Sequence, residues 1–203
     1  MENYKKNLEL LTKNHVYSKE MEHDACGVGL IASTEGKKSR AIVEYGIEAL
    51  KAVWHRGAVD ADGKTGDGAG IHVEIPKDFF IEKIEVTGHD YDNAEICVGM
   101  IFLPRNDYAA QESCKTIVES ELTKNNFSIY GWRQVPVNPK VLGDKALQTM
   151  PEIIQVLFKS NDNNLLDKKL ERKIYETRKR IENKAFQLSL NNFYICSISS
   201  KSI

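Results

Sequence analysis

The chain has 203 residues, of which 41% are hydrophobic and 28% are charged, a composition typical of one globular domain with a substantial core. Its 28 Lys and Arg against 29 Asp and Glu leave a net charge of −1, which argues against nucleic-acid binding, because that class carries a clear basic excess. No apolar run approaches the roughly 18 residues of a membrane helix, and the first twenty residues are too polar for a signal peptide. We therefore expect a cytoplasmic protein.

The four cysteines are widely separated, at Cys26, Cys97, Cys114 and Cys196. None forms a CxxC pair or a Cys/His spacing that would suit zinc, so we expect no metal site. In a reducing compartment a cysteine is more often a small buried apolar residue than a reactive one. A catalytic role for any of them needs a special local context.

The first half of the chain changes character at Gly27. Residues 1–25 are a polar, charged leader, whereas the run GVGLIAS at 27–33 has the length of a strand. Apolar residues spaced by four, three and four predict a helix over residues 40–54 that ends near His55. The glycine-rich loop HRGAVDADGKTGDGAG follows, and the alternating segment IHVEI at 71–75 predicts a strand.

In the second half, strands and helices alternate after a charged segment at 77–94. We predict strands at 95–103, 127–135, 152–158 and 193–199, helices at 107–123 and 167–185, and a turn at 136–143. Asp107 is placed to cap the first of these helices. This order predicts an α+β layered domain rather than a Rossmann domain. Because the sequence stops directly after a strand, we interpret it as an interrupted domain.

The segment TGDGAG at 65–70 is similar to a phosphate-binding loop at first sight. A P-loop, however, continues with Lys and Ser or Thr at the start of a helix, whereas a strand pattern follows Gly70. A nucleotide-binding module is therefore disfavoured. Tight turns between elements are the favoured explanation of the glycines and aspartates of this loop.

Cys26 lies where the polar leader meets the first apolar run. Cleavage before it would leave one residue carrying both a thiol, with a reference pKa near 8.5, and an α-amine, with a reference pKa of about 7.7 to 8.0. The amine could then serve as the internal base of the nucleophile, as it does for N-terminal threonine. From these residues alone, a buried structural cysteine remains the alternative.

Six separated motifs carry a resemblance that extends over essentially the whole chain. They are DACGVGLIA from Asp24, HRGA from His55, ADGKTGDGAG from Ala61, VGM from Val98, GWRQVP from Gly131 and FYICS from Phe193. In order and spacing they resemble the amino-terminal glutaminase domain of the glutamate synthase large-subunit family. This domain is a class II glutamine amidotransferase of the N-terminal nucleophile hydrolase type.

The resemblance implies an αββα four-layer sandwich, here incomplete at its C-terminal end, with residues 1–25 as propeptide and 26–203 as the amidotransferase portion. It implies Cys26 as the nucleophile that hydrolyses L-glutamine to glutamate and ammonia. The ammonia would feed an oxidoreductase reaction that makes glutamate from 2-oxoglutarate. We expect no cofactor in this segment, and FMN and an iron–sulfur cluster in the full-length enzyme. The expected partners are the rest of the synthase chain and a reductase subunit or ferredoxin.

Other site residues follow from the same motifs. Arg56, Gly57, Asp67 and Gly68 are expected to bind substrate or support the site, with local support favoured for Arg56, while His55 is expected to be structural. The family's later HxRFST-like segment and its Asn-Gly pair do not occur in these 203 residues. Because loss of one oxyanion donor costs about 100- to 1000-fold in rate, we predict that this chain alone is inactive. The alternative is a truncated fragment that acts only as a folding or interaction unit.

Overall fold

The computed structural model describes residues 6–7, 9–10, 12–13, 27–54, 57–165 and 167–203. These residues form two compact units, one within residues 1–58 and the other over residues 59–203. Each unit is described by itself below.

The first unit contains helix α2, Arg40–Ala52. Ser39 caps it, because its side-chain oxygen accepts a hydrogen bond from the Ala41 backbone N–H at 3.2 Å. The helix predicted over 40–54 is thus confirmed, with an end two residues earlier. The strand predicted at 27–33 is wrong: Val28 and Leu30 are 93% and 91% exposed and have no strand pairing. A strand needs a ladder partner, and the described residues of this unit offer none.

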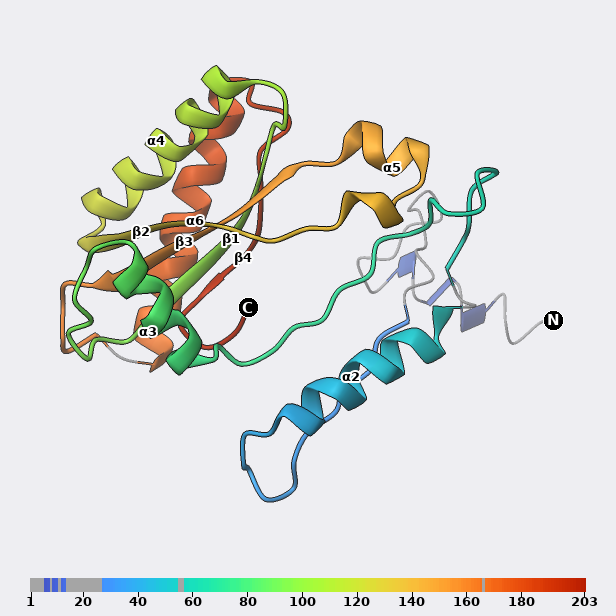
Figure 1. Ribbon diagram of the computed structural model, residues 1–203, viewed down its shortest axis with the longest axis horizontal. Helices are drawn as coiled ribbons and strands as arrows, with labels where there is room; N and C mark the ends of the chain where they lie inside the picture. The colour runs from blue at the N-terminus through green and yellow to red at the C-terminus, as the bar shows by residue number, and fades with distance from the viewer. Residues whose placement is uncertain (1–5, 8, 11, 14–26, 55–56, 166) are drawn as a thin grey trace. The chain divides into compact units, whose positions relative to one another are not determined.

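The second unit is built on one four-stranded sheet with the order β2-β3-β1-β4, in which all neighbours are antiparallel. Its main elements follow the order β-α-β-β-α-β. They are β1 (Cys97–Leu103), α4 (Tyr108–Lys124), β2 (Phe127–Gln134), β3 (Glu152–Ser160), α6 (Asp167–Gln187) and β4 (Tyr194–Ser199). This is the split βαβ topology of ferredoxin-like folds. Figure 1 shows α4 and α6 side by side against one face of the sheet.

The four strands and two helices predicted for this half are confirmed within a few residues. Asp107 caps α4 as expected, since its Oδ1 accepts a hydrogen bond from the Ala110 N–H at 2.9 Å. The strand predicted at 71–75 is reduced to a single bridge between Glu74 and Ser202, flanked by reciprocal Val73–Ile203 hydrogen bonds of 2.9 Å.

Three helical elements were not predicted. Helix α3 (Lys77–Val86) lies in the segment interpreted only as charged, and the 3-10 helix η2 (Pro139–Val141) and helix α5 (Asp144–Thr149) lie in and after the predicted turn. Helix α3 forms because Phe80 and Ile84, four residues apart, share one face and are buried. Ile81 lies on the same face and packs against the same cluster, whereas Phe79 and Val86 are exposed, so the apolar pattern of the segment is mixed.

The core has one apolar cluster on each face of the sheet. Alternate residues of β1 divide between them: Cys97, Ile101 and Leu103 pack toward α4 and α6, whereas Val98 packs with the residues of α3. In the larger cluster the rings of Phe127 and Phe158 meet edge to face, with centroids 5.3 Å apart. The unit is thus α+β as predicted. The four-layer sandwich stays a prediction.

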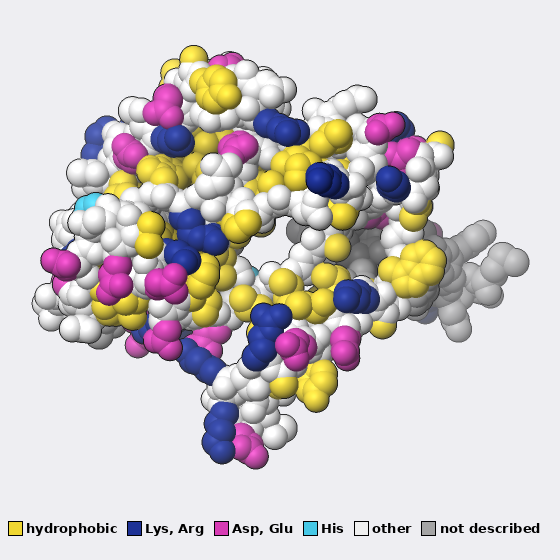
Figure 2. Space-filling view, in the orientation of Figure 1, with side chains coloured by type: hydrophobic (Ala, Val, Ile, Leu, Met, Phe, Trp, Pro, Cys, Tyr) yellow, Lys and Arg dark blue, Asp and Glu magenta, His cyan; other side chains and the backbone are white. Residues whose placement is uncertain are grey.

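Charged side chains of both signs intermingle on the face drawn in Figure 2. Several are paired, as in the Arg172–Glu176 and Arg178–Glu182 ion pairs of α6. Within the described part of the chain, every helix is too short or too polar to cross a membrane. The cytoplasmic location remains a prediction.

Glu121 is a buried carboxylate that joins the two covering helices. It lies on α4 with 5% exposure, is paired with Lys184 of α6, and has Lys124 at 3.6 Å. The hydrogen bond from Lys184 is the main reason that the pKa of Glu121 lies below its ordinary value of 4.5. A carboxyl whose pKa is lowered by folding adds stability above its ordinary pKa, and this stability is lost as the pH falls through the lowered value.

We predict that Gly99→Ala destabilises the protein by about 1–3 kcal/mol. A Cβ at this position of β1 would lie 2.8 Å from Cγ1 of Val156 on the neighbouring strand, so the pairing must shift. The measurement is chemical denaturation beside Gly70→Ala, where a Cβ would meet no atom within 4 Å. Equal stabilities of the two variants would contradict the prediction.

We predict that Glu121→Gln lowers the free energy of unfolding at neutral pH by about 1–3 kcal/mol, because it leaves the α4–α6 link without its charge. The loss should shrink as the pH falls below 4.5, where the unfolded chain takes up a proton at this carboxyl, and should vanish once the pH has fallen through the lowered pKa of the folded protein. Denaturation over a pH series would test this, with Glu176→Gln as control, since that carboxylate is 53% exposed in its pair. A pH-independent difference between parent and Glu121→Gln would be inconsistent with the assignment.

Candidate functional site

The structure places three of the five predicted site residues. Cys26 and Arg56 lie outside the described residues. Gly57 follows α2 in the first unit, where its N–H donates to the Trp54 carbonyl at 3.1 Å. Asp67 and Gly68 are adjacent and exposed in the second unit, directly after the loop at 59–66. The roles predicted for these residues therefore stay predictions.

The loop at 59–66 is a closed hairpin. Its two ends meet in an antiparallel bridge between Val59 and Gly66, and the Asp60 N–H donates to the Thr65 carbonyl at 2.7 Å. At the tip, the Gly63 N–H donates to the Asp60 carbonyl at 2.9 Å, and Gly63 has a φ of +68°, a conformation that favours glycine. The tight turn thus lies at residues 60–63, before the segment 65–70 for which tight turns were predicted, and residues 67–70 form none.

Asp62 organises the interior of this hairpin. Its Oδ1 accepts hydrogen bonds from the backbone N–H groups of Lys64 at 2.9 Å and Thr65 at 2.7 Å, while the Thr65 hydroxyl donates to Oδ2 at 2.5 Å. These bonds, the one from the Thr65 hydroxyl above all, lower the pKa of Asp62 to about 2. Asp62 is therefore ionised at neutral pH.

The hairpin rests on the start of α5. The Asp144 backbone N–H lies close enough to the Asp62 carboxylate to contribute to its lowered pKa. Gly143 just before it allows the contact, because a Cβ there would lie 2.3 Å from Asp62 Oδ2 and 2.2 Å from Thr65 Oγ1. Lys145 adds an ion pair to Asp60 at 2.5 Å. Sequence analysis missed these partners, although Asp-x-x-Thr is a recognisable turn signal.

This arrangement fixes the conformation of the loop before Asp67 and Gly68. The hairpin keeps the exposed Asp67 carboxylate and the Gly68 backbone at the end of a fixed turn, which suits the wall of a site. The nucleophile predicted for the reaction, Cys26, is outside the described residues.

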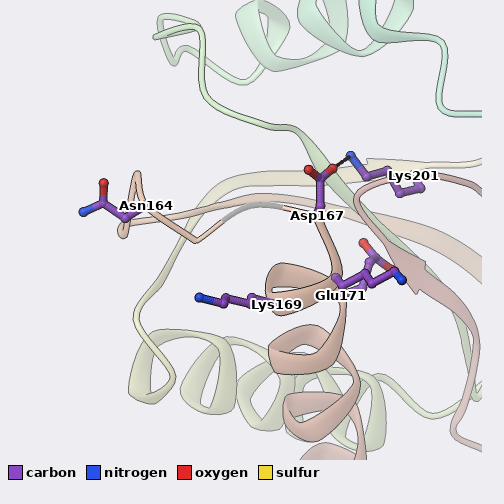
Figure 3. Close-up of a pocket in the computed structure, with 6 residues that line it drawn as sticks. Asn164, Asp167, Lys169, Glu171 and Lys201 are labelled. Atoms are coloured by element: carbon purple, nitrogen blue, oxygen red, sulfur yellow. Dashed lines mark ion pairs between the residues drawn. The ribbon is translucent and has the colours of Figure 1, made fainter.

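A separate open hollow of about 910 Å³ lies at the start of α6 (Figure 3). It is lined by Asn164, Asp167, Lys168, Lys169, Glu171 and Lys201. Lys201 pairs with Asp167 at 3.1 Å, and the Glu171 carboxylate accepts hydrogen bonds from the Ser199 hydroxyl at 2.9 Å and the Ser200 N–H at 2.7 Å. Acids at this hollow are thus bound to groups of the protein itself. Gly57, Asp67 and Gly68 do not line it.

The three described cysteines differ in accessibility. Cys97 and Cys114 are buried, whereas Cys196 is exposed. Burial raises the pKa of the Cys97 thiol strongly and that of Cys114 to about 11, so neither is a thiolate at neutral pH. Within the described residues, no three His, Cys, Asp or Glu side chains gather to hold a metal ion.

The chain belongs to the class-II glutamine amidotransferases, whose family model matches residues 26–203. It is therefore an enzyme domain. The glutamate synthase [NADPH] large chain of Azospirillum brasilense is 51% identical over 200 residues, which are 98% of this chain and 13% of that protein. The resemblance that the motifs indicated is thus confirmed.

Ferredoxin-dependent glutamate synthases are also similar to this chain. The chloroplastic/mitochondrial enzyme 1 of Arabidopsis thaliana is 39% identical over 184 residues, and that of Pyropia yezoensis is 38% identical over 201 residues. These stretches are 90% and 96% of this chain but only 11% and 12% of the relatives. The chain therefore spans about an eighth of the length of these relatives.

We predict that Cys97 and Cys114 of the native protein resist a thiol-alkylating reagent at neutral pH, and that Cys196 reacts faster than both. The physical reason is burial, which excludes the reagent and suppresses the thiolate. Peptide mass spectrometry after timed alkylation measures each site, with the denatured protein as the control in which all three react. Labelling of Cys97 at the rate of Cys196 would contradict the packing of β1.

Proposed function

We propose that this domain hydrolyses glutamine to glutamate and ammonia with Cys26 as an N-terminal nucleophile. The observation that carries the proposal is the extent of the family match, which begins at residue 26 and so starts at this cysteine. Residues 1–25 then serve as a propeptide, and 26–203 as amidotransferase. The burial of Cys97 and Cys114 supports the choice, because neither can reach a substrate.

The proposed reaction uses both groups of residue 26. The α-amine accepts the thiol proton, and the thiolate attacks the side-chain carboxamide carbon of glutamine. The carbon–nitrogen bond breaks, the amine returns the proton to the leaving nitrogen, and ammonia departs. Water then adds to the glutamyl thioester, which releases glutamate and restores the thiol.

The residues around the nucleophile have supporting roles in this proposal. Arg56 and Gly57 support the catalytic segment, and Asp67 and Gly68 form part of the wall that holds glutamine. Support for the role of Asp67 and Gly68 comes from the 59–66 hairpin, which the Val59–Gly66 bridge closes directly before Asp67.

We further propose that the sheet of the second unit is one layer of a four-layer αββα sandwich. Helices α4 and α6 cover one face, and α3 packs on part of the other, beside Val98. On the same side of β1 as Val98 lie the partly exposed Met100 and Phe102, the latter against the exposed Tyr194 with ring centroids 6.0 Å apart. A second sheet packed on this side would bury these residues.

In a longer protein of the relatives' kind, the ammonia would be used to make glutamate from 2-oxoglutarate. The relatives named as NADPH- or ferredoxin-dependent suggest a reductase subunit or ferredoxin as the partner. FMN and an iron–sulfur cluster would belong to the remainder of that protein. Such a cluster needs several gathered thiolates, and the described cysteines form no such group with other ligands.

We predict that Cys26→Ala in the full-length protein abolishes glutamine-dependent glutamate synthesis and spares synthesis from added ammonia. Only the ammonia-generating half loses its nucleophile. The two rates are measured on one preparation, with Cys196→Ala as the matched control, since that exposed thiol has no proposed role. Glutamine-dependent activity in Cys26→Ala would refute the assignment.

We predict that the mature protein begins at Cys26, because the mechanism needs the free amine of that residue. Intact-mass analysis of the active enzyme would show the loss of residues 1–25. An active enzyme that retains Ala25 would rule out the amine as base.

A further inference from the structure

We infer that Asp62 is a positioning residue for glutamine hydrolysis, because it fastens the 59–66 hairpin to the start of α5 and thereby sets the place of Asp67 and Gly68. This inference rests on the proposed function. No role in the reaction was assigned to Asp62 above.

The junction between the hairpin and α5 is built on the Asp62 carboxylate. Both of its oxygens hold the hairpin turn, Oδ1 through the N–H groups of Lys64 and Thr65 and Oδ2 through the Thr65 hydroxyl. Oδ2 also lies against Gly143, the residue before α5, where a Cβ would come within 2.3 Å of it. One side chain thus links the internal turn to a separate helix.

Two contacts join the hairpin to the start of α5, the Asp60–Lys145 ion pair and the packing against Gly143. The Asp60–Lys145 ion pair is partly exposed, with Lys145 at 69%, and such pairs contribute little. The contact at Gly143 is backbone packing that leaves no room for a side chain, since a Cβ there would lie 2.6 Å from the Thr65 backbone nitrogen. The hairpin can therefore keep this position on α5 only while residue 143 is glycine.

The junction also determines the position of Asp67 and Gly68, because they directly follow the hairpin. The hairpin ends at Gly66, which is bridged to Val59, and Asp67 follows immediately. A shift of the hairpin on α5 must therefore move Asp67 and Gly68 as well. Misplacement by about 1 Å can cost on the order of 100-fold in rate.

Two variants test the junction from opposite sides. In Asp62→Asn, the amide oxygen can still accept the Lys64 and Thr65 N–H hydrogen bonds, and the amide NH₂ group can donate to the Thr65 hydroxyl, which reverses that bond. The negative charge beside Gly143 and Asp144 is lost, and an N–H donor takes the place of the acceptor there. Gly143→Ala leaves the turn residues intact and pushes the hairpin away from α5. The matched control is Asp78→Asn, an exposed acid in the first turn of α3.

The expected result in the full-length protein is a rise in KM for glutamine and a fall of about 10- to 100-fold in glutamine-dependent kcat/KM for both variants. Synthesis from ammonia should stay at the parent rate, and alkylation of Cys26 by iodoacetamide should be unchanged, which shows that the nucleophile is intact. Since both substitutions break one contact, the double variant should lose less than the product of the single losses.

Two outcomes would overturn the inference. One is a glutamine KM within about twofold of the parent in both variants, far less than a 1 Å displacement should cause. The other is a parallel fall in ammonia-dependent synthesis, which would indicate general destabilisation. Failure of the proposed function has a different signature, because Cys26→Ala would then retain glutamine-dependent activity.

Discussion

Strand β1 lies between β3 and β4 and has apolar clusters on both of its faces. Each residue from Cys97 to Leu103 is paired with β3, and the close approach to Val156 requires glycine at position 99. Alternation of side chains along one strand therefore determines which residues meet α4 and α6 and which meet α3. The burial of Cys97, and with it the suppression of its thiolate, follows from this placement.

Two carboxylates each link a helix to another element of the second unit. Glu121 links α4 to α6 through Lys184, and Glu171 of α6 holds the turn after β4 through Ser199 and Ser200. In each case a carboxylate with little exposure is satisfied by groups from another element, as the cost of burying a charge requires. The Glu121 pair holds α4 beside α6. The Glu171 hydrogen bonds hold the turn after β4, directly before the residues that pair with 73–75.

The loop before Asp67 illustrates how a chemically plain segment can matter for function. Asp62 holds the turn through hydrogen bonds with Thr65. The hairpin also packs against Gly143, at the start of a short helix that lies far along the chain. The substrate-binding wall proposed for Asp67 and Gly68 would need such support, because rate depends on the placement of groups to within about 1 Å. The proposed nucleophile, Cys26, thus lies far in the sequence from the residues that hold this loop in place.

The sequence by itself determined the family, through motifs that include Cys26, and most elements of the second unit. Apolar period and capping are local, so the strands at β1 and β3 and the cap at Asp107 could be predicted closely. Tertiary structure alone decided the rest. Helix α3 was missed because the exposed Phe79 and Val86 interrupt the pattern of its buried apolar residues, and the described part of the chain gives residues 27–33 no ladder partner of the kind that a strand needs. The contact of Asp62 with Gly143 joins residues far apart in the chain, and no local pattern encodes a distance between them.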